Sequence, residues 1–168
     1  MATEINKMPA DEGVRLVVSM LHAGYLSEVS GVNRTLISKG VSHAFVNGKP
    51  FYFIESHVRK LQDAMHTISA QLMTTKILPG EVTAEEQPFA YGSDFIEKFK
   101  NLRKHVAIQY ILRDSLGWTE GQIKMRLSRK EGPYYGVFTE EHLTAINGAI
   151  HLLALQLGSI ELELQQPE

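Results

Sequence analysis

The segment GVNRTLISKGVSH, residues 31–43, carries polar side chains of the types that bind DNA. Asparagine and arginine can hydrogen-bond to base edges in the major groove, and serine, threonine and lysine contact bases or phosphates. Asn33 is a good N-cap for a short helix whose apolar residues Leu36, Ile37 and Val41 would face inward. The candidate DNA-binding residues are those on its exposed side and one lysine from the following loop: Asn33, Arg34, Thr35, Ser38, Lys39 and Lys49.

A second set of candidates follows 86 positions later in GWTEGQIKMRLSR, residues 117–129. Thr119 takes the N-cap place of Asn33, while Glu120 and Gly121 replace Arg34 and Thr35. Because the first helical turn lacks these polar side chains, we expect this copy to hold phosphates more than bases. The candidate residues are Thr119, Lys124, Arg126, Arg129 and Lys130.

Seven histidines raise the alternative of a metal site, which their spacing disfavours. His57 and His66 are nine residues apart, about two and a half helical turns, so they point to opposite sides of one helix. The same holds for His142 and His151, and we expect His66 and His151 to contribute to helix packing. We therefore predict no metal and no cofactor.

Catalytic motifs are missing as well. The chain has no cysteine, no nucleophile motif, no phosphate loop and no dinucleotide glycine pattern. The run Glu140-Glu141-His142 follows Thr139, and an N-cap with acids in the first helical turn explains it better than a catalytic cluster does. We predict that the protein is not an enzyme.

The elements that would position these residues are two copies of a 21-residue stretch, 53–73 and 138–158. At an offset of 85, seven positions are identical, namely Phe53/Phe138, Glu55/Glu140, His57/His142, Ala64/Ala149, His66/His151, Gln71/Gln156 and Leu72/Leu157. This similarity predicts an internal duplication. Apolar residues recur at steps of three and four in both copies: Val58, Leu61, Met65, Ile68 and Leu72, and Leu143, Ile146, Ile150, Leu153 and Leu157. Each set forms one stripe on a long helix, which could pack on the other helix or on a second subunit.

Each long helix follows a helix-turn-helix pattern. We predict one helix from Gly13 to Ser30, a turn at Gly31 and the short helix described above. Asn47-Gly48 then predicts a hairpin or a small wing between apolar runs. A further helix is expected to begin at Phe95, and the last long helix to continue to Ile160 and Leu164.

The predicted fold is all-α, with short β-ribbons allowed in the loops. We divide the chain into a flexible tail (1–12), a first repeat (13–78), a linker (79–94), a second repeat (95–164) and a tail (165–168). At 168 residues and 43% hydrophobic content, the chain can bury a core. No run of 18 apolar residues and no secretory signal occurs, so we expect a cytoplasmic protein without a membrane span.

The net charge of −2 is unevenly distributed. Residues 33–60 hold five basic residues against one acid, and residues 98–130 hold nine against two, which gives local charges of +4 and +7. Local basic patches on a neutral chain suit a nucleic-acid-binding protein. Ordinary solvated helix faces would have the same composition.

The segments GVNRTLIS…NGKPFYF and GWTEGQIKM…EGPYYGVF carry a family resemblance. In its short helix-turn-helix, aromatic loop and long helix, each copy resembles the N-terminal part of FlhC, a subunit of the flagellar master regulator. That family has a cysteine zinc site, and this chain has no cysteine. Neither the zinc site nor the flagellar role is therefore carried over. The resemblance implies a bacterial transcription regulator.

We predict a protein that binds double-stranded DNA, as a transcription regulator or an accessory factor of a mobile element of bacterial or phage type. Two recognition helices would lie about one DNA turn (roughly 34 Å) apart if the long helices pair about a pseudo-twofold axis. The alternative is a protein-interaction adaptor, such as a phage or plasmid protein that captures a host factor. An adaptor would need apolar residues exposed on the stripes beyond those used for internal pairing. A homodimer could form through the long helices.

Overall fold

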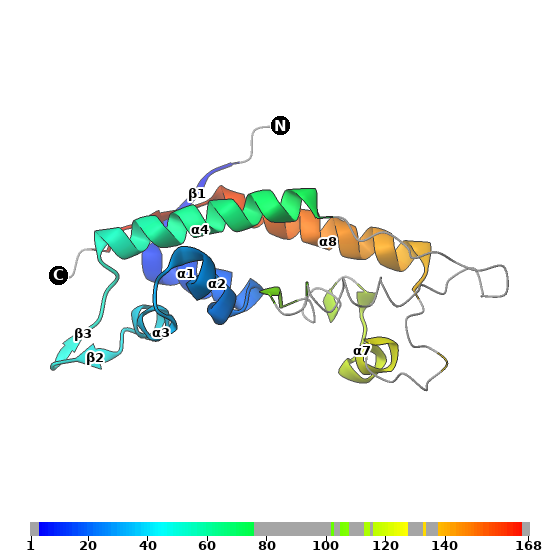
Figure 1. The fold of residues 1–168 in the computed structure, drawn as a ribbon, viewed down its shortest axis with the longest axis horizontal. Helices are drawn as coiled ribbons and strands as arrows, with labels where there is room; N and C mark the ends of the chain where they lie inside the picture. The colour runs from blue at the N-terminus through cyan, green and yellow to red at the C-terminus, as the bar shows by residue number, and fades with distance from the viewer. Residues whose placement is uncertain are drawn as a thin grey trace. The chain divides into compact units, whose positions relative to one another are not determined.

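A computed structural model of the chain describes residues 4–75, 102, 105–107, 113, 114, 116–127, 133 and 138–165. Within this part the fold is mainly α-helical, with short strands (Figure 1). The chain divides into two compact units, which differ from the predicted repeats. Unit 1 contains Met1–Thr74 and Leu152–Glu168, and unit 2 contains Thr75–His151. The end of the last helix therefore belongs to unit 1.

Unit 1 contains four helices of the N-terminal half. They are α1 (Ala10–Met20), α2 (Ala23–Ser30), α3 (Arg34–Ser42) and α4 (Glu55–Thr74). A hairpin of β2 (Phe45–Val46) and β3 (Lys49–Pro50) joins α3 to α4. In Figure 1, α4 runs along one side of unit 1, and α3 and the hairpin lie on the opposite side. The last eight residues of α8 (Glu140–Ser159) also belong to this unit.

The prediction of one helix from Gly13 to Ser30 is wrong. The helix breaks at Leu21, whose backbone is extended, and α2 begins two residues later. Leu21 is fully buried, and its amide still donates to the carbonyl oxygen of Val17 at 2.8 Å. The break lets Leu21 enter the core while α2 takes a new direction, a tertiary preference that helical periodicity does not contain.

Both ends of the described chain also differ from expectation. The tail predicted for residues 1–12 instead contains β1 (Asn6–Pro9) and the start of α1. The last helix ends at Ser159, and the residues expected to continue it form β4 (Ile160–Glu163), which pairs in parallel with β1. Burial alternates along β4, with Ile160 and Leu162 inside and Glu161 and Glu163 outside. This period of two is typical of a half-buried strand and not of a helix.

The free edge of β4 contacts α4 through one side chain. Gln62 Nε2 donates to the carbonyl oxygen of Ile160 at 2.9 Å, and the amide of Leu162 donates to Gln62 Oε1 at 2.6 Å. The side-chain amide therefore makes the two hydrogen bonds that a neighbouring strand would make. It satisfies the backbone of β4 on the side opposite β1.

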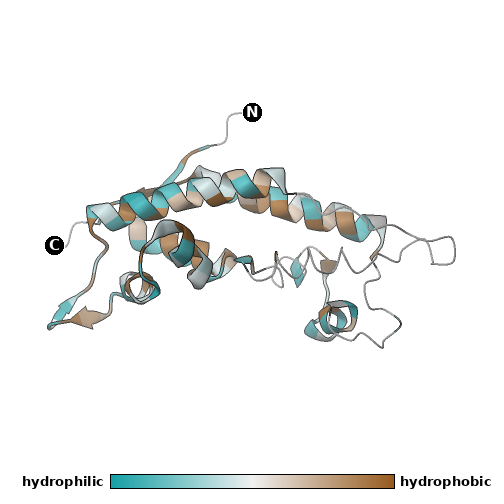
Figure 2. Cartoon of the chain, viewed as in Figure 1, coloured by the Kyte–Doolittle hydropathy of each residue, from teal (hydrophilic) through white to brown (hydrophobic). Residues whose placement is uncertain are grey.

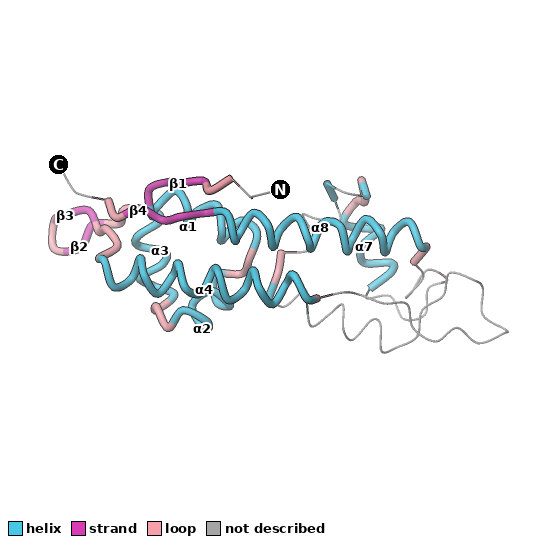
Figure 3. Tube along the Cα trace, turned by 90° about the horizontal axis from the view of Figure 1, so that it is seen from above, coloured by secondary structure: helices cyan, strands magenta, loops and turns pink. Residues whose placement is uncertain are grey.

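Helix α4 packs antiparallel to the end of α8. Ser69 Oγ donates to the carbonyl oxygen of Ala154 at 2.6 Å, and Gln62, earlier in α4, reaches β4 beyond α8. A Cβ atom built at Gly158 would lie 2.9 Å from Ser69 Oγ, so the two helices approach closely there. Figure 3 shows the last turns of α8 beside α4. All ten predicted stripe residues are buried, which confirms the apolar pattern of both long helices.

Unit 2 is described in part. It contains α7 (Glu120–Leu127) and the first twelve residues of α8. Trp118, Ile123 and Phe138 are buried, and the rings of Trp118, just before α7, and Phe138, just before α8, lie 5.8 Å apart. The expected linker (79–94) and most of the helix expected from Phe95 lie outside the described residues.

Candidate nucleic-acid interface

Helix α3 begins where the sequence predicts. Asn33 Oδ1 accepts a hydrogen bond from the Thr35 amide at 2.8 Å, which confirms Asn33 as the N-cap. Gly31 adopts a left-handed conformation with φ of 75°, so the chain can leave α2 and enter α3 within three residues. Ser27 Oγ donates to the carbonyl oxygen of Val32 at 2.7 Å and fixes this turn. α2 and α3 are thus two short helices joined by a three-residue turn.

The C-terminal end of α3 is attached to α1 by two polar side chains. Arg15 donates a hydrogen bond to the carbonyl oxygen of Val41 at 2.7 Å. His43 Nε2 lies 3.0 Å from Asp11 Oδ2, and the Asp11 side chain is only 8% exposed. These contacts join residues more than 25 positions apart. They restrict the rotation of α3 about its own axis, and sequence patterns did not indicate them.

The inner side of α3 packs directly on the residues that precede α4. Ile37 and Gly40 are buried, and Leu36 is partly buried. A Cβ atom at Gly40 would overlap the Phe53 ring, which is itself 2% exposed. The ring therefore occupies the space that any larger residue at Gly40 would need. This close packing determines which side of α3 faces solvent.

The outer side of α3 carries the predicted polar residues. Asn33, Arg34, Thr35 and Ser38 are exposed, and Lys39 is partly exposed. Lys49 is exposed on the hairpin, which lies on the same side of unit 1 as α3 (Figure 1). The structure therefore brings all six residues of the first set to one side of this unit.

The electrostatic environment of this surface is positive. No aspartate or glutamate occurs between Glu28 and Glu55. Within the described part of the chain, Arg34, Lys39 and Lys49 form no ion pair with a carboxylate. By contrast, Arg59 of α4 pairs with Glu55 at 3.0 Å. Unneutralised cations on a rigid helix and hairpin are what binding to a polyanion requires.

The second set of candidates makes local contacts in unit 2. Thr119 caps α7, because the Gln122 amide donates to Thr119 Oγ1 at 3.3 Å and the Thr119 amide donates to Gln122 Oε1 at 2.8 Å. Lys124 Nζ lies 3.5 Å from Glu120. Arg126 lies 4.7 Å above the centre of the Trp118 ring. Arg129 and Lys130 are outside the described residues.

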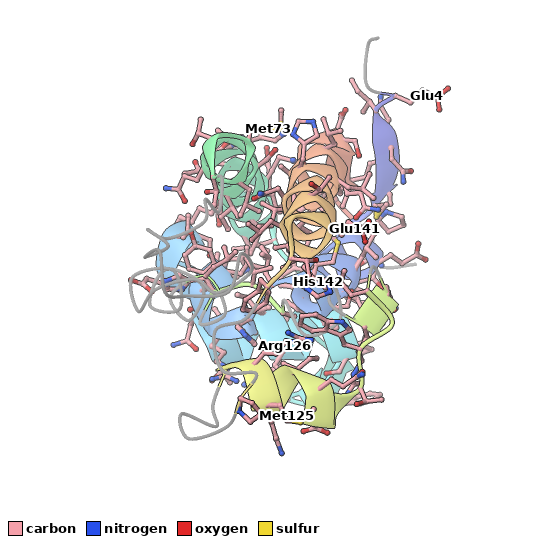
Figure 4. All side chains as sticks on the ribbon, turned by 90° about the vertical axis from the view of Figure 1, so that its right-hand side faces the viewer. Glu4, Met73, Met125, Arg126, Glu141 and His142 are labelled. Atoms are coloured by element: carbon pink, nitrogen blue, oxygen red, sulfur yellow. The ribbon has the colours of Figure 1, made fainter. Side chains whose placement is uncertain are left out.

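A histidine performs the same capping role at the start of α8. The His142 amide donates to Thr139 Oγ1 at 3.1 Å, and the Thr139 amide donates to His142 Nδ1 at 3.1 Å. Since Nδ1 accepts this bond, His142 is in the neutral form with its proton on Nε2. Burial, and then the positive charge of Arg126, lower the pKa of His142, and Glu141 opposes them. Figure 4 shows His142 and Arg126, which extend from α8 and α7.

The exposure of the histidines on the two long helices differs from our expectation. His66 and His151, which we expected to take part in helix packing, are exposed, and His66 contacts Gln62 on its own helix. His57 and His142 are partly buried instead. Burial, and then the charge of Lys60, lower the pKa of His57. The apolar stripe of each helix faces the core, and His57 and His142 lie nearer to that stripe than His66 and His151 do.

Comparisons with protein-family models, curated proteins and solved structures found no match to this chain. Among the described residues, no three potential ligands from His, Cys, Asp and Glu come together as they would around a metal ion. The described helices also include none with the length and apolarity needed to cross a bilayer. The function is therefore inferred from the geometry of unit 1.

Proposed function

We propose that the protein binds double-stranded DNA through the outer side of α3, as a transcription regulator or an accessory factor of a mobile element. Asn33, Arg34 and Ser38 would contact base edges in the major groove, and Lys39 and Lys49 would contact phosphates. The proposal adds no catalytic step and no cofactor. DNA binding of this kind is in keeping with the bacterial transcription regulator class that the FlhC resemblance implies.

One observation carries the proposal. A helix-turn-helix presents a polar, basic helix face whose cations have no carboxylate partner in the described part of the chain. The N-cap, the bonds from α1 and the packing of Gly40 on Phe53 fix the orientation of this face. A fixed orientation matters because base contacts depend on side chains reaching defined positions in the groove.

We expect unit 2 to make fewer contacts with DNA bases than unit 1. Thr119 is used as a cap, Lys124 pairs with Glu120 and Arg126 stacks on Trp118. An arginine above an aromatic ring and a lysine with a partly screened charge can still contact phosphates. We therefore keep Thr119, Lys124, Arg126, Arg129 and Lys130 as candidate backbone contacts.

An internal duplication is part of the proposal. The contact between Ser69 and Ala154 joins two residues that are equivalent at the offset of 85. In an antiparallel pair of equivalent helices, a residue meets its own equivalent where a twofold axis passes. This contact supports the hypothesis that the long helices descend from one ancestral helix. A chain of this origin would bind DNA with two related half-sites.

A salt titration of binding to mixed-sequence duplex DNA tests the function. The wild-type protein is compared with Arg34→Ala/Lys39→Ala and with the control Arg59→Ala/Lys60→Ala, which removes the same charge from α4. We expect micromolar or tighter binding by the wild-type protein, and a salt slope that only the α3 variant reduces, by about two.

Equal losses in both variants would mean that binding follows net charge and not the α3 surface. Wild-type protein that does not bind duplex DNA even at low salt would overturn the function and favour the adaptor. The adaptor hypothesis needs apolar residues exposed on the stripes, and all ten stripe residues are buried.

A further inference from the structure

Phe45 on the β2–β3 hairpin is the most exposed of the large apolar side chains in the described part of the chain. Its side chain is 75% exposed, compared with 43–67% for the other large exposed apolar residues. Figure 2 shows the apolar β2 beside the hydrophilic β3. An aromatic ring left in water on a short hairpin contributes little to the core, so its stability role is small.

The hairpin is held rigidly at the end of α3. The Ala44 amide donates to the carbonyl oxygen of Lys39 at 3.0 Å, which joins the start of the hairpin to the last turn of α3. The Phe51 amide donates to the carbonyl oxygen of Ala44 at 2.9 Å and closes the hairpin at its base. The rings of Phe51 and Phe53 make an edge contact at 6.3 Å. The hairpin therefore keeps a fixed position relative to the outer side of α3.

The tip of the hairpin is tight and well defined. Asn47 and Gly48 have φ angles of 52° and 77°, the left-handed pair that a two-residue hairpin turn requires. Phe45 is paired with Pro50, and Val46 with Lys49. The exposed ring and the exposed lysine are thus carried by opposite strands of one small arm. The arm begins three residues after α3 ends.

The positive charge on and near the hairpin indicates the class of partner. Two basic residues, Arg34 and Lys39, precede the hairpin in the sequence, and a third, Lys49, lies on it. No acid occurs from residue 29 to residue 54. A nucleic acid accepts an aromatic ring and several cations together, because its stacked bases are apolar and its backbone is anionic. An acidic protein surface would satisfy the cations but offers no stack of flat rings.

We propose that the β2–β3 hairpin is a second DNA contact, in which Phe45 wedges between base pairs in the minor groove beside the major groove occupied by α3. Lys49 contacts the phosphates that separate the two grooves. The arm extends about 7–10 Å beyond α3, since each strand residue adds about 3.4 Å, and this is enough to cross one sugar–phosphate backbone. Apolar wedges of this kind unstack a base step and bend the duplex. This inference rests on the proposed DNA binding.

The experiment uses a mixed-sequence duplex of about 30 base pairs, close to three helical turns, with a donor and an acceptor dye at its ends. Affinity and energy transfer are measured for the wild-type protein, Phe45→Ala, Phe45→Trp and the control Ile54→Ala. Ile54 is also an exposed apolar residue, at 57%, but it lies next to α4 and outside the hairpin. Circular dichroism and urea unfolding confirm that each variant is folded.

We expect Phe45→Ala to weaken binding about tenfold, as loss of one base–aromatic contact does, and to abolish the rise in energy transfer that reports bending. Its salt slope should equal that of the wild-type protein, because no charge is removed, whereas Lys49→Ala should reduce the slope by about one. Phe45→Trp should keep the affinity, and its added indole fluorescence should be quenched on binding. Ile54→Ala should behave like the wild-type protein.

Two other results separate this inference from the function on which it rests. Wild-type binding that Phe45→Ala leaves unchanged in affinity and bending would overturn the hairpin contact and leave the α3 contact in place. A wild-type protein that does not bind the duplex would overturn both.

Discussion

At the scale of single residues, the start of α8 depends on the protonation of His142. The chain uses the same reciprocal cap twice, with Gln122 as the third helical residue of α7 and His142 as the third of α8. A glutamine amide accepts a hydrogen bond at any pH near neutrality, whereas an imidazole accepts through Nδ1 only when it is neutral. The two caps should therefore respond differently to acid.

We expect the free energy of unfolding to fall as the solution is acidified from about pH 7.5 to about pH 5.5. The folded state lowers the pKa of His142, so the unfolded state takes up its proton first, near the ordinary pKa of about 6.5. The stability that neutral His142 provides is complete above that pKa and is lost as the pH falls through the lowered folded value. His142→Gln should keep the cap and reduce this pH dependence, as measured by urea unfolding at both pH values.

His151→Gln on the exposed side of α8 is the matched control, because this substitution leaves both caps intact, and it should unfold like the wild-type protein at both pH values. Some dependence should remain in His142→Gln, because burial also lowers the pKa of His57. A wild-type stability that is the same at both pH values would contradict the capping role of neutral His142.

At the scale of elements, a single glutamine replaces a missing strand. β4 pairs with β1 on one side and exchanges two hydrogen bonds with the Gln62 side chain on the other, through the Ile160 carbonyl and the Leu162 amide. Two strands of four residues form a marginal sheet, which needs packing and satisfied backbone groups to persist. The sheet therefore depends on α4 as well as on its own pairing.

Gln62→Ala should lower the free energy of unfolding by about 1–3 kcal/mol, because the carbonyl of Ile160 and the amide of Leu162 would lose their partners. Hydrogen exchange should become faster at the Leu162 amide in particular. Gln156→Ala, an exposed glutamine of α8, should change stability by less than about 0.5 kcal/mol. Equal stability of the two variants would show that water replaces the side-chain amide without cost.

At the scale of the whole molecule, unit 1 is closed by residues far apart in the sequence. The hydrogen bond from Ser69 to Ala154 spans 85 positions, and those from Gln62 span 98 and 100. The C-terminal segment thus packs against α4 and completes the core of unit 1, on the side opposite α3. Folding of the proposed DNA-binding unit should require this long-range contact.

Ser69→Leu should destabilise the protein by about 1–3 kcal/mol, because the new side chain would overlap the close approach of α4 to Ala154 and Gly158. Ala70→Leu, which adds a similar volume on the exposed side of the same helix, is the control. Urea unfolding compares the two. A Ser69→Leu protein as stable as the control would mean that α4 and α8 can separate locally without loss of the core.

Local signals in the sequence predicted a large share of unit 1. The N-cap at Asn33, the turn at Gly31 and the hairpin at Asn47-Gly48 are all confirmed, since each depends on the conformation of a few neighbouring residues. The apolar stripes of the long helices are confirmed for the same reason. The outer side of α3 could be predicted from its own periodicity, although its DNA-binding role remains a prediction.

Only the tertiary structure decided which distant segments meet. The break at Leu21, the attachment of α3 by Asp11 and Arg15, and the pairing of β1 with β4 each join a local pattern to a partner elsewhere. The sequence by itself determined where helices are capped and which sides are apolar, because these are short-range steric and hydrogen-bonding preferences. The choice of partners depends on burying apolar surface and satisfying polar groups across the whole unit, which no short stretch of sequence contains.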